Sequence, residues 1–112
     1  PTPSSAASDV YKRQAYRWQV FSKASSLMHG ETMGAEASYM KIFWSELDVD
    51  LHATALELLA ERGELLASAP DAISEHDWMS GYLFSLSGPI YAGTNEIQRN
   101  IVAERVLGLP RK

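Results

Sequence analysis

The clearest hydrophobic pattern in the chain runs from Gly34 to Arg62. Apolar positions recur there in steps of three or four residues, at Phe43, Leu47, Leu51, Ala55 and Leu58. Acidic residues occupy other faces, and no Pro or Gly interrupts the stretch from Ala35 to Arg62. This spacing predicts one long amphipathic helix of the kind found in antiparallel bundles, with Gly63 as its stop.

Shorter stretches predict three further helices. Residues 15–28 have helical spacing and end at His29-Gly30, where Gly suits the position after a helix. Residues 78–86 form one broad apolar face after a loop, with Ser74 as the expected cap and Asp77 at its third helical position. The last helix is expected to begin at Thr94 or Asn95 and to continue to about Leu107, after a short extended segment at 90–93. No useful strand pattern occurs, so the fold class is all-α.

The first fourteen residues, PTPSSAASDVYKRQ, look foreign to the rest of the chain. Their last six residues resemble a translated sequencing adapter. We therefore expect residues 1–14 to be a disordered, non-native leader and residues 15–112 to hold the domain. A native disordered tail is the alternative, and neither interpretation gives these residues a function.

Composition removes several classes of function. The chain has 112 residues, no cysteine and a net charge of −4. The stretch from Glu31 to Asp77 contains eleven acidic and two basic residues, a local net charge of −9. This charge argues against duplex nucleic acid as the main partner. The missing cysteines exclude disulfides and thiolate chemistry, and the three histidines lack metal-binding spacing, so no metal site is expected.

The stretch of greatest chemical interest is the Gly-containing turn at residues 90–94, which feeds the last helix. The start of a helix collects free N–H groups and the positive end of the helix dipole, which suits an anion or a polar cofactor group. A glycine at position 93 would let a ligand approach the backbone closely. A plain helix cap inside a bundle explains the same residues.

The run GTNEIQRNIVAERVLGLP at residues 93–110 resembles the C-terminal signature of the acyl-CoA dehydrogenase family. The resemblance covers residues 15–110 and implies the later helices of that family's C-terminal helical domain, hence an incomplete bundle. It also implies FAD as cofactor and the α,β-dehydrogenation of acyl-CoA thioesters. In this chemistry a carboxylate takes the α proton and the flavin accepts the β hydride.

Family roles transfer to particular positions. Many members place the catalytic Glu where this chain has Ala92, so the resemblance implies no catalytic base in this chain. Gly93 matches a substrate-contacting position. Three residues match FAD-contacting positions, Thr94, Asn95 and Glu96. Five others match a segment that approaches the FAD of a neighbouring subunit, Glu57, Leu58, Leu59, Ala60 and Glu61. The last two stand where the family usually has Gly-Gly, and a Glu there would repel a pyrophosphate.

Three interpretations remain open at this point. The chain is a C-terminal fragment of an active dehydrogenase, a non-catalytic subunit of a heteromeric dehydrogenase, or an unrelated helical interaction module. Under the first two, the resemblance implies as partners an acyl-CoA, an electron acceptor and other subunits in a homo- or hetero-oligomer, with a dimer of dimers expected. A cytoplasmic location is expected.

Overall fold

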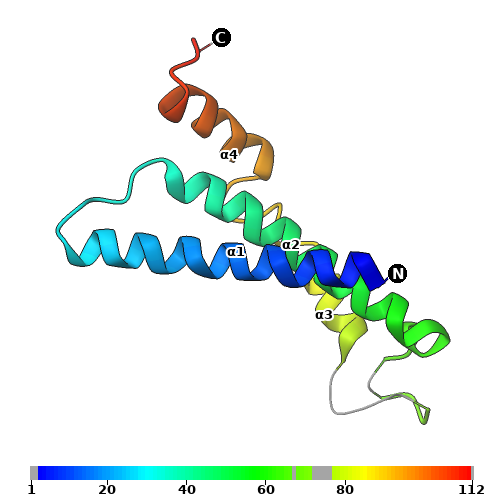
Figure 1. Ribbon diagram of the computed structural model, residues 1–112. Coiled ribbons are helices and arrows are strands. Elements are labelled where there is room, and N and C mark those ends of the chain that lie inside the picture. The colour runs from blue at the N-terminus through cyan, green and yellow to red at the C-terminus, as the bar shows by residue number, and fades with distance from the viewer. Residues whose placement is uncertain (1–2, 67, 72–76, 112) are drawn as a thin grey trace.

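The computed structural model of this protein describes residues 3–66, 68–71 and 77–111, and these residues form helices joined by turns and loops (Figure 1). Four α-helices and two short helical segments of other types follow one another along the chain. In order they are α1 (Pro3–Met28), α2 (Glu36–Leu59), the 3₁₀ segment η1 (Ala60–Glu64), α3 (Trp78–Ser85), α4 (Asn95–Ile101) and the π-helical segment η2 (Val102–Val106). The all-α prediction is confirmed.

Helices α1 and α2 form an antiparallel pair joined by a short loop (Figure 1). Gly30 has a φ of +84° just beyond the end of α1, which is the conformation that favours glycine after a helix. The rings of Tyr16 and Phe43 stack between the two helices with centroids 6.1 Å apart. Lys23 of α1 pairs with Glu36 of α2 at 3.5 Å. The pair therefore combines an aromatic contact with a charge contact.

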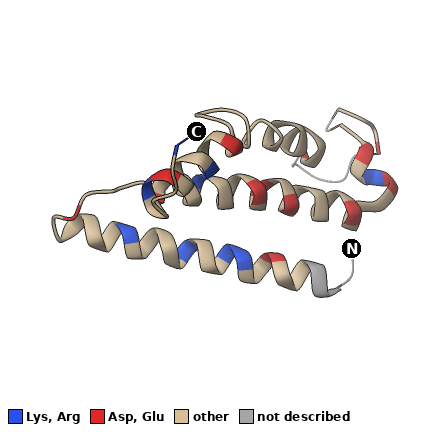
Figure 2. Ribbon diagram, turned by 90° about the horizontal axis from the view of Figure 1, so that it is seen from above, with Lys and Arg blue, Asp and Glu red and all other residues tan. Residues whose placement is uncertain are grey.

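Charge is divided between these two helices. Figure 2 shows Lys and Arg along α1 and Asp and Glu along α2 and the segment that follows it. Lys12 of α1 lies 3.2 Å from Asp50 of α2, a second ion pair across the interface. The acidic middle of the sequence is thus partly neutralised by the basic first helix.

Helix α2 is the centre of the arrangement, because α1, α3 and α4 all contact it. The buried positions at these contacts are mostly small and polar, namely Ser38, Ser45, Ser85 and Asn95. Small side chains let backbones approach closely. A Cβ on Gly88 would come within 3.3 Å of the Ser45 Cβ atom, so the turn after α3 lies directly against α2.

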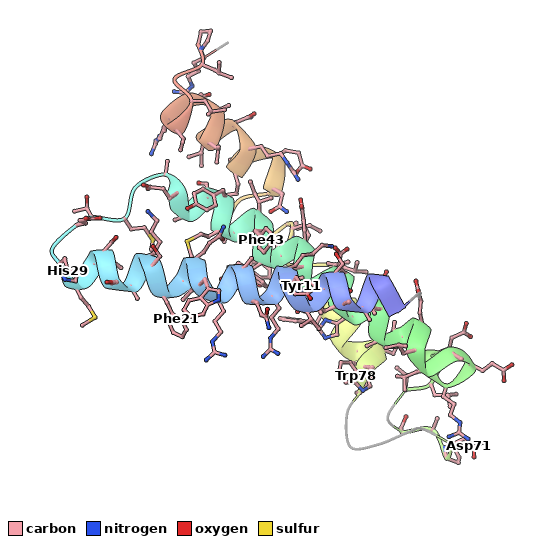
Figure 3. All side chains as sticks on the ribbon, in the orientation of Figure 1. Tyr11, Phe21, His29, Phe43, Asp71 and Trp78 are labelled. Atoms are coloured by element: carbon pink, nitrogen blue, oxygen red, sulfur yellow. The ribbon has the colours of Figure 1, made fainter. Side chains whose placement is uncertain are left out.

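The apolar core is thin. Leu47 is the only large hydrophobic residue that is buried among the residues whose side chains the structure describes. The radius of gyration is 17.3 Å, against about 13 Å for a compact domain of roughly this length. Many apolar side chains remain exposed, including Trp18, Phe84 and Phe21, the last labelled on α1 in Figure 3. That the bundle is incomplete stays a prediction. No helix in the described residues is long and apolar enough to cross a membrane.

The expectation that the first fourteen residues are disordered is wrong for residues 3–14, which form the first half of α1. The segment makes polar contacts with α2. Asp9 is buried and accepts a hydrogen bond of 2.7 Å from the Thr54 hydroxyl. The non-native origin of the segment stays a prediction, and residues 1 and 2 lie outside the described residues.

Three other boundaries differ from expectation. The cap of α3 is Asp77, whose carboxylate accepts from the Ser80 N–H at 2.9 Å; the expected cap, Ser74, lies outside the described residues. Residues 90–93 form a turn rather than an extended segment, because the N–H groups of Ile90 and Tyr91 both bond to the Ser87 carbonyl. The last helix changes from α to π geometry at Val102 and ends at Val106.

Candidate functional site

The turn at residues 91–94 is held by side chains as well as by backbone hydrogen bonds, one of which joins the Asn95 N–H to the Pro89 carbonyl at 2.9 Å. Ala92 and Gly93 have φ angles of +53° and +84°. The Gln98 side-chain amide donates to the Ala92 carbonyl at 2.9 Å. A Cβ on Gly93 would lie 2.8 Å from the Gln98 Nε2 atom. Glycine at 93 is favoured by the backbone conformation, and a side chain there would also displace the Gln98 amide that bonds to the Ala92 carbonyl.

Asn95 fixes the start of α4 against α2. Its side chain is buried, with only 2% of the residue exposed. The amide oxygen accepts from the Lys41 ammonium at 2.8 Å, and the amide nitrogen donates to the Ser45 hydroxyl at 3.1 Å and to Glu46 at 3.3 Å. Glu46 also forms an ion pair with Arg99. Since its oxygen and its nitrogen both have protein partners, this side chain ties two helices together.

Thr94 and Glu96 lie at the open side of the same helix start. The Thr94 hydroxyl accepts from the Ile97 N–H at 3.4 Å, which makes Thr94 rather than Asn95 the N-cap. Hydrogen bonding to its own N–H, followed by the Thr94 hydroxyl, holds the pKa of the exposed Glu96 carboxyl below its ordinary value. This carboxylate is therefore a hydrogen-bond acceptor at neutral pH and is suited to hydroxyl or amide donors rather than to phosphate.

The second group of candidate residues, at 57–61, lies elsewhere on the molecule. Asn95 packs beside residues 41–46, about 18 Å along α2 from Glu57 at 1.5 Å per residue. Ala60 has a φ of +50°, the left-handed range that favours glycine, at the position where the resemblance implies Gly. Leu58 and Glu61 are exposed. The structure does not bring this group together with residues 93–96.

The two groups differ in how well they fit FAD. The helix start at 93–96 offers an open glycine, a hydroxyl and an acceptor carboxylate, which fit the neutral, hydroxyl-bearing parts of a flavin nucleotide. The end of α2 presents Glu57, Glu61 and Glu64 with Arg62 as the neighbouring base. Three carboxylates do not fit a pyrophosphate. No group of three or more potential metal ligands occurs among the described residues.

Comparison with known proteins identifies the family of this chain. Residues 6–107 match the family model described as "Acyl-CoA dehydrogenase, C-terminal domain". The chain belongs to the acyl-CoA dehydrogenase family.

Curated relatives of this acyl-CoA dehydrogenase domain come from Mycobacterium tuberculosis. The acyl-CoA dehydrogenase IpdE1 is 42% identical over 72 residues, which are 64% of this chain and 18% of that protein. The acyl-CoA dehydrogenase FadE26 is 30% identical over 94 residues, which are 84% of this chain and 24% of that protein. The chain thus spans less than a quarter of the length of these relatives.

Solved structures share the fold. The ChsE4–ChsE5 complex of M. tuberculosis superposes with a TM-score of 0.79 at 29% identity, covering 91% of this chain and 26% of that one. The steroid ACAD Tcur3481–Tcur3483 superposes with a TM-score of 0.85 at 23% identity, covering 99% of this chain and 30% of that one. The second likeness, at this identity, concerns the fold alone.

Sequence reasoning missed the side chains that hold the site. It singled out Thr94 and Asn95 but gave no role to Lys41, Ser45 or Gln98. Gln98 lies in the signature run, but nothing in the sequence links its side chain to the Ala92 carbonyl. Lys41 and Ser45 lie about fifty residues earlier, and nothing in a single sequence links them to Asn95.

Proposed function

We propose that this chain is the C-terminal part of an FAD-dependent dehydrogenase that introduces a double bond between the α and β carbons of an acyl-CoA thioester. One observation carries the proposal. The Gly93 turn and the start of α4, which hold the family signature, are locked onto α2 by Lys41 and Asn95. A turn built this way presents a defined backbone surface to a ligand instead of only ending a loop.

The catalytic base lies outside this turn. Ala92 occupies the position where many family members carry a Glu, and a methyl group takes no proton. FAD, when bound, supplies the acceptor for the β hydride. In this division of labour, Gly93 gives the thioester room to approach, and Thr94 and Glu96 offer polar groups to the flavin nucleotide.

Asn95 receives a different role from the one that the resemblance implies. Its side chain is buried and fully used by α2, so it orients the helix start instead of touching FAD. The end of α2, with Ala60 and Glu61 in place of the usual glycines, is proposed to contribute subunit surface but not a pyrophosphate site.

A non-catalytic subunit of a heteromeric dehydrogenase is the second candidate. Ala92 favours it, and so does the likeness at 29% identity to a protein whose solved structure is a complex of two named components. Under either candidate the complete enzyme works with other subunits and an electron acceptor, and we propose a cytoplasmic location for it.

The experiment compares two glycines with the same backbone conformation. Gly93 and Gly30 both have a φ of +84°, but a Cβ meets Gln98 at the first and nothing within 4 Å at the second. In the complete enzyme we expect Gly93→Val to weaken acyl-CoA binding and flavin retention by more than about tenfold, and Gly30→Val to leave both unchanged. Binding would be measured by calorimetry and flavin content by its absorbance. Equal behaviour of the two variants would contradict the proposal.

A further inference from the structure

Lys41 joins two acceptors that lie more than fifty residues away in sequence. It lies on α2, and its ammonium nitrogen is 3.0 Å from the Gly93 carbonyl oxygen and 2.8 Å from the Asn95 Oδ1 atom. Hydrogen bonds from a charged donor are roughly twice as strong as neutral ones. One cation therefore holds both the turn and the first residue of α4.

The direction of these bonds sets the direction of the turn's N–H groups. The described chain contains no cis peptide bond, and in a trans peptide the N–H points opposite to the carbonyl of the same unit. Lys41 draws the Gly93 carbonyl toward α2, so the Thr94 N–H faces away from α2. Gln98 draws in the Ala92 carbonyl, so the Gly93 N–H faces away from Gln98.

Asn95 makes Lys41 a fixed support instead of a mobile surface side chain. Its amide is clamped by Ser45, which is completely buried, and by Glu46. A second donor at the Gly93 carbonyl, the Gln98 amide nitrogen, is neutral and farther away at 3.5 Å, and the cation Arg99 of α4 pairs with Glu46. Arg99 is therefore committed to a different acceptor and does not duplicate the bond to the Gly93 carbonyl.

We propose that Lys41 is a positioning residue for the proposed reaction: it holds the turn at residues 91–94 in the conformation that presents Gly93 and Thr94 to the bound thioester and flavin. The inference rests on the proposed function and adds to it a residue outside the signature run. Lys41 acts through the backbone of the turn and touches no reacting atom.

The test uses the complete FAD-loaded enzyme with four variants. Lys41→Met removes the charge and the donor, Lys41→Gln keeps a shorter neutral donor, and Lys41→Arg keeps the charge. Lys23→Met is the matched control, because Lys23 is also a cation that joins a second segment to the start of α2, but its partner there is Glu36 and not the turn. Two quantities are measured: deuterium uptake by the peptide covering residues 88–98, and kcat with KM for an acyl-CoA.

For Lys41→Met we expect exchange in that peptide to quicken about tenfold and kcat to fall roughly 10- to 100-fold, with KM changed less than about threefold. Lys41→Arg should restore both quantities to within about threefold of the original enzyme, and Lys23→Met should leave both unchanged. Should Lys41→Met fail to fold, Lys41→Gln gives an intermediate loss in the same direction.

Unchanged exchange in residues 88–98 overturns the proposal, and so does faster exchange with unchanged kcat. A loss that Lys41→Arg does not rescue, or that Lys23→Met shares, also overturns it. Failure of the proposed function looks different, because the unmutated enzyme would then hold no FAD or leave acyl-CoA unchanged. The exchange measurement still decides in that case whether Lys41 holds the turn.

Discussion

Two alanines with left-handed backbones mark the positions where this chain departs from its family's usual pattern. Ala60 ends α2 with φ +50° and ψ −131°, and Ala92 lies in the site turn with φ +53°. A Cβ is unfavourable in this range by about 1–2 kcal/mol. The chain accepts this strain at both positions, which indicates that the surrounding contacts fix the backbone more strongly than the residue type does.

Ala60→Gly should stabilise the chain by about 1 kcal/mol, because glycine adopts a positive φ without a Cβ clash. The matched control is Ala53→Gly in the middle of α2, where the same change should destabilise by roughly 0.5–1 kcal/mol. Urea unfolding of the complete enzyme, followed by circular dichroism, measures both. Destabilisation by Ala60→Gly would show that Ala60 does not have the backbone conformation described above.

Ala92→Glu should leave the free energy of unfolding within about 0.5 kcal/mol of the original value, since Ala92 is exposed and already carries a Cβ. The substitution places a carboxylate at the usual position of the family's base. Thermal unfolding of the complete enzyme checks the first point. A loss above about 2 kcal/mol would mean that the turn packs against something that leaves no room for a longer side chain.

At the scale of elements, periodicity was enough to predict α2 to within two or three residues and to place the end of α1 at Met28. It failed for the first half of α1, where Asp9 and Thr54 supply a buried hydrogen bond instead of an apolar stripe. It also left the cap of α4 undecided, because Thr94 and Asn95 are both good caps. Only the tertiary contact of Asn95 with Ser45 separates their roles.

The start of α2 gives a pH-dependent prediction. The Glu36 carboxyl accepts a hydrogen bond from the backbone N–H of Glu36, and this bond is the main reason why its pKa lies below the ordinary value of 4.5. The positive charge of Lys23 is the next largest cause. A lowered folded-state pKa stabilises the fold above 4.5 and loses that contribution as the pH falls through and below this value. In the complete enzyme, Glu36→Gln should therefore lower the urea midpoint at neutral pH and leave it nearly unchanged near pH ~3.

Glu31→Gln, in the preceding loop, is the control for this pH dependence. This substitution also removes one carboxylate, but from an exposed position outside any helix. We expect its urea midpoint to follow that of the original chain at both pH values. An equal effect of the two substitutions would assign the pH dependence to net charge instead of to the start of α2.

At the scale of the whole molecule, we expect the chain to be unstable alone, because many of its apolar side chains are exposed. Leu47 is its one buried large hydrophobic residue among those described, while side chains such as Trp18 and Leu58 stay exposed. Full burial of each such side chain would contribute about 1.5–3 kcal/mol. The free energy lost when several such side chains stay exposed equals the whole free energy of unfolding of a small domain, about 5–15 kcal/mol.

We therefore expect the isolated chain to be helical by far-UV circular dichroism, to self-associate, and to hold no FAD after gel filtration. Analytical ultracentrifugation measures the self-association, and near-UV circular dichroism measures how firmly the aromatic side chains are packed. A strictly monomeric species with a sharp near-UV signal from Trp44 and Trp78, and with cooperative unfolding, would show that the chain is a self-sufficient domain.

The most direct test of the central claim is anaerobic addition of an acyl-CoA to the complete FAD-loaded enzyme, together with its partner subunit if it has one. Because the base is proposed to lie outside residues 91–94, the flavin absorbance of the enzyme with Ala92 should bleach on addition of substrate. Ala92→Glu should not be needed for this reaction. A fully loaded enzyme that does not bleach, or that bleaches only after Ala92→Glu, would contradict the account.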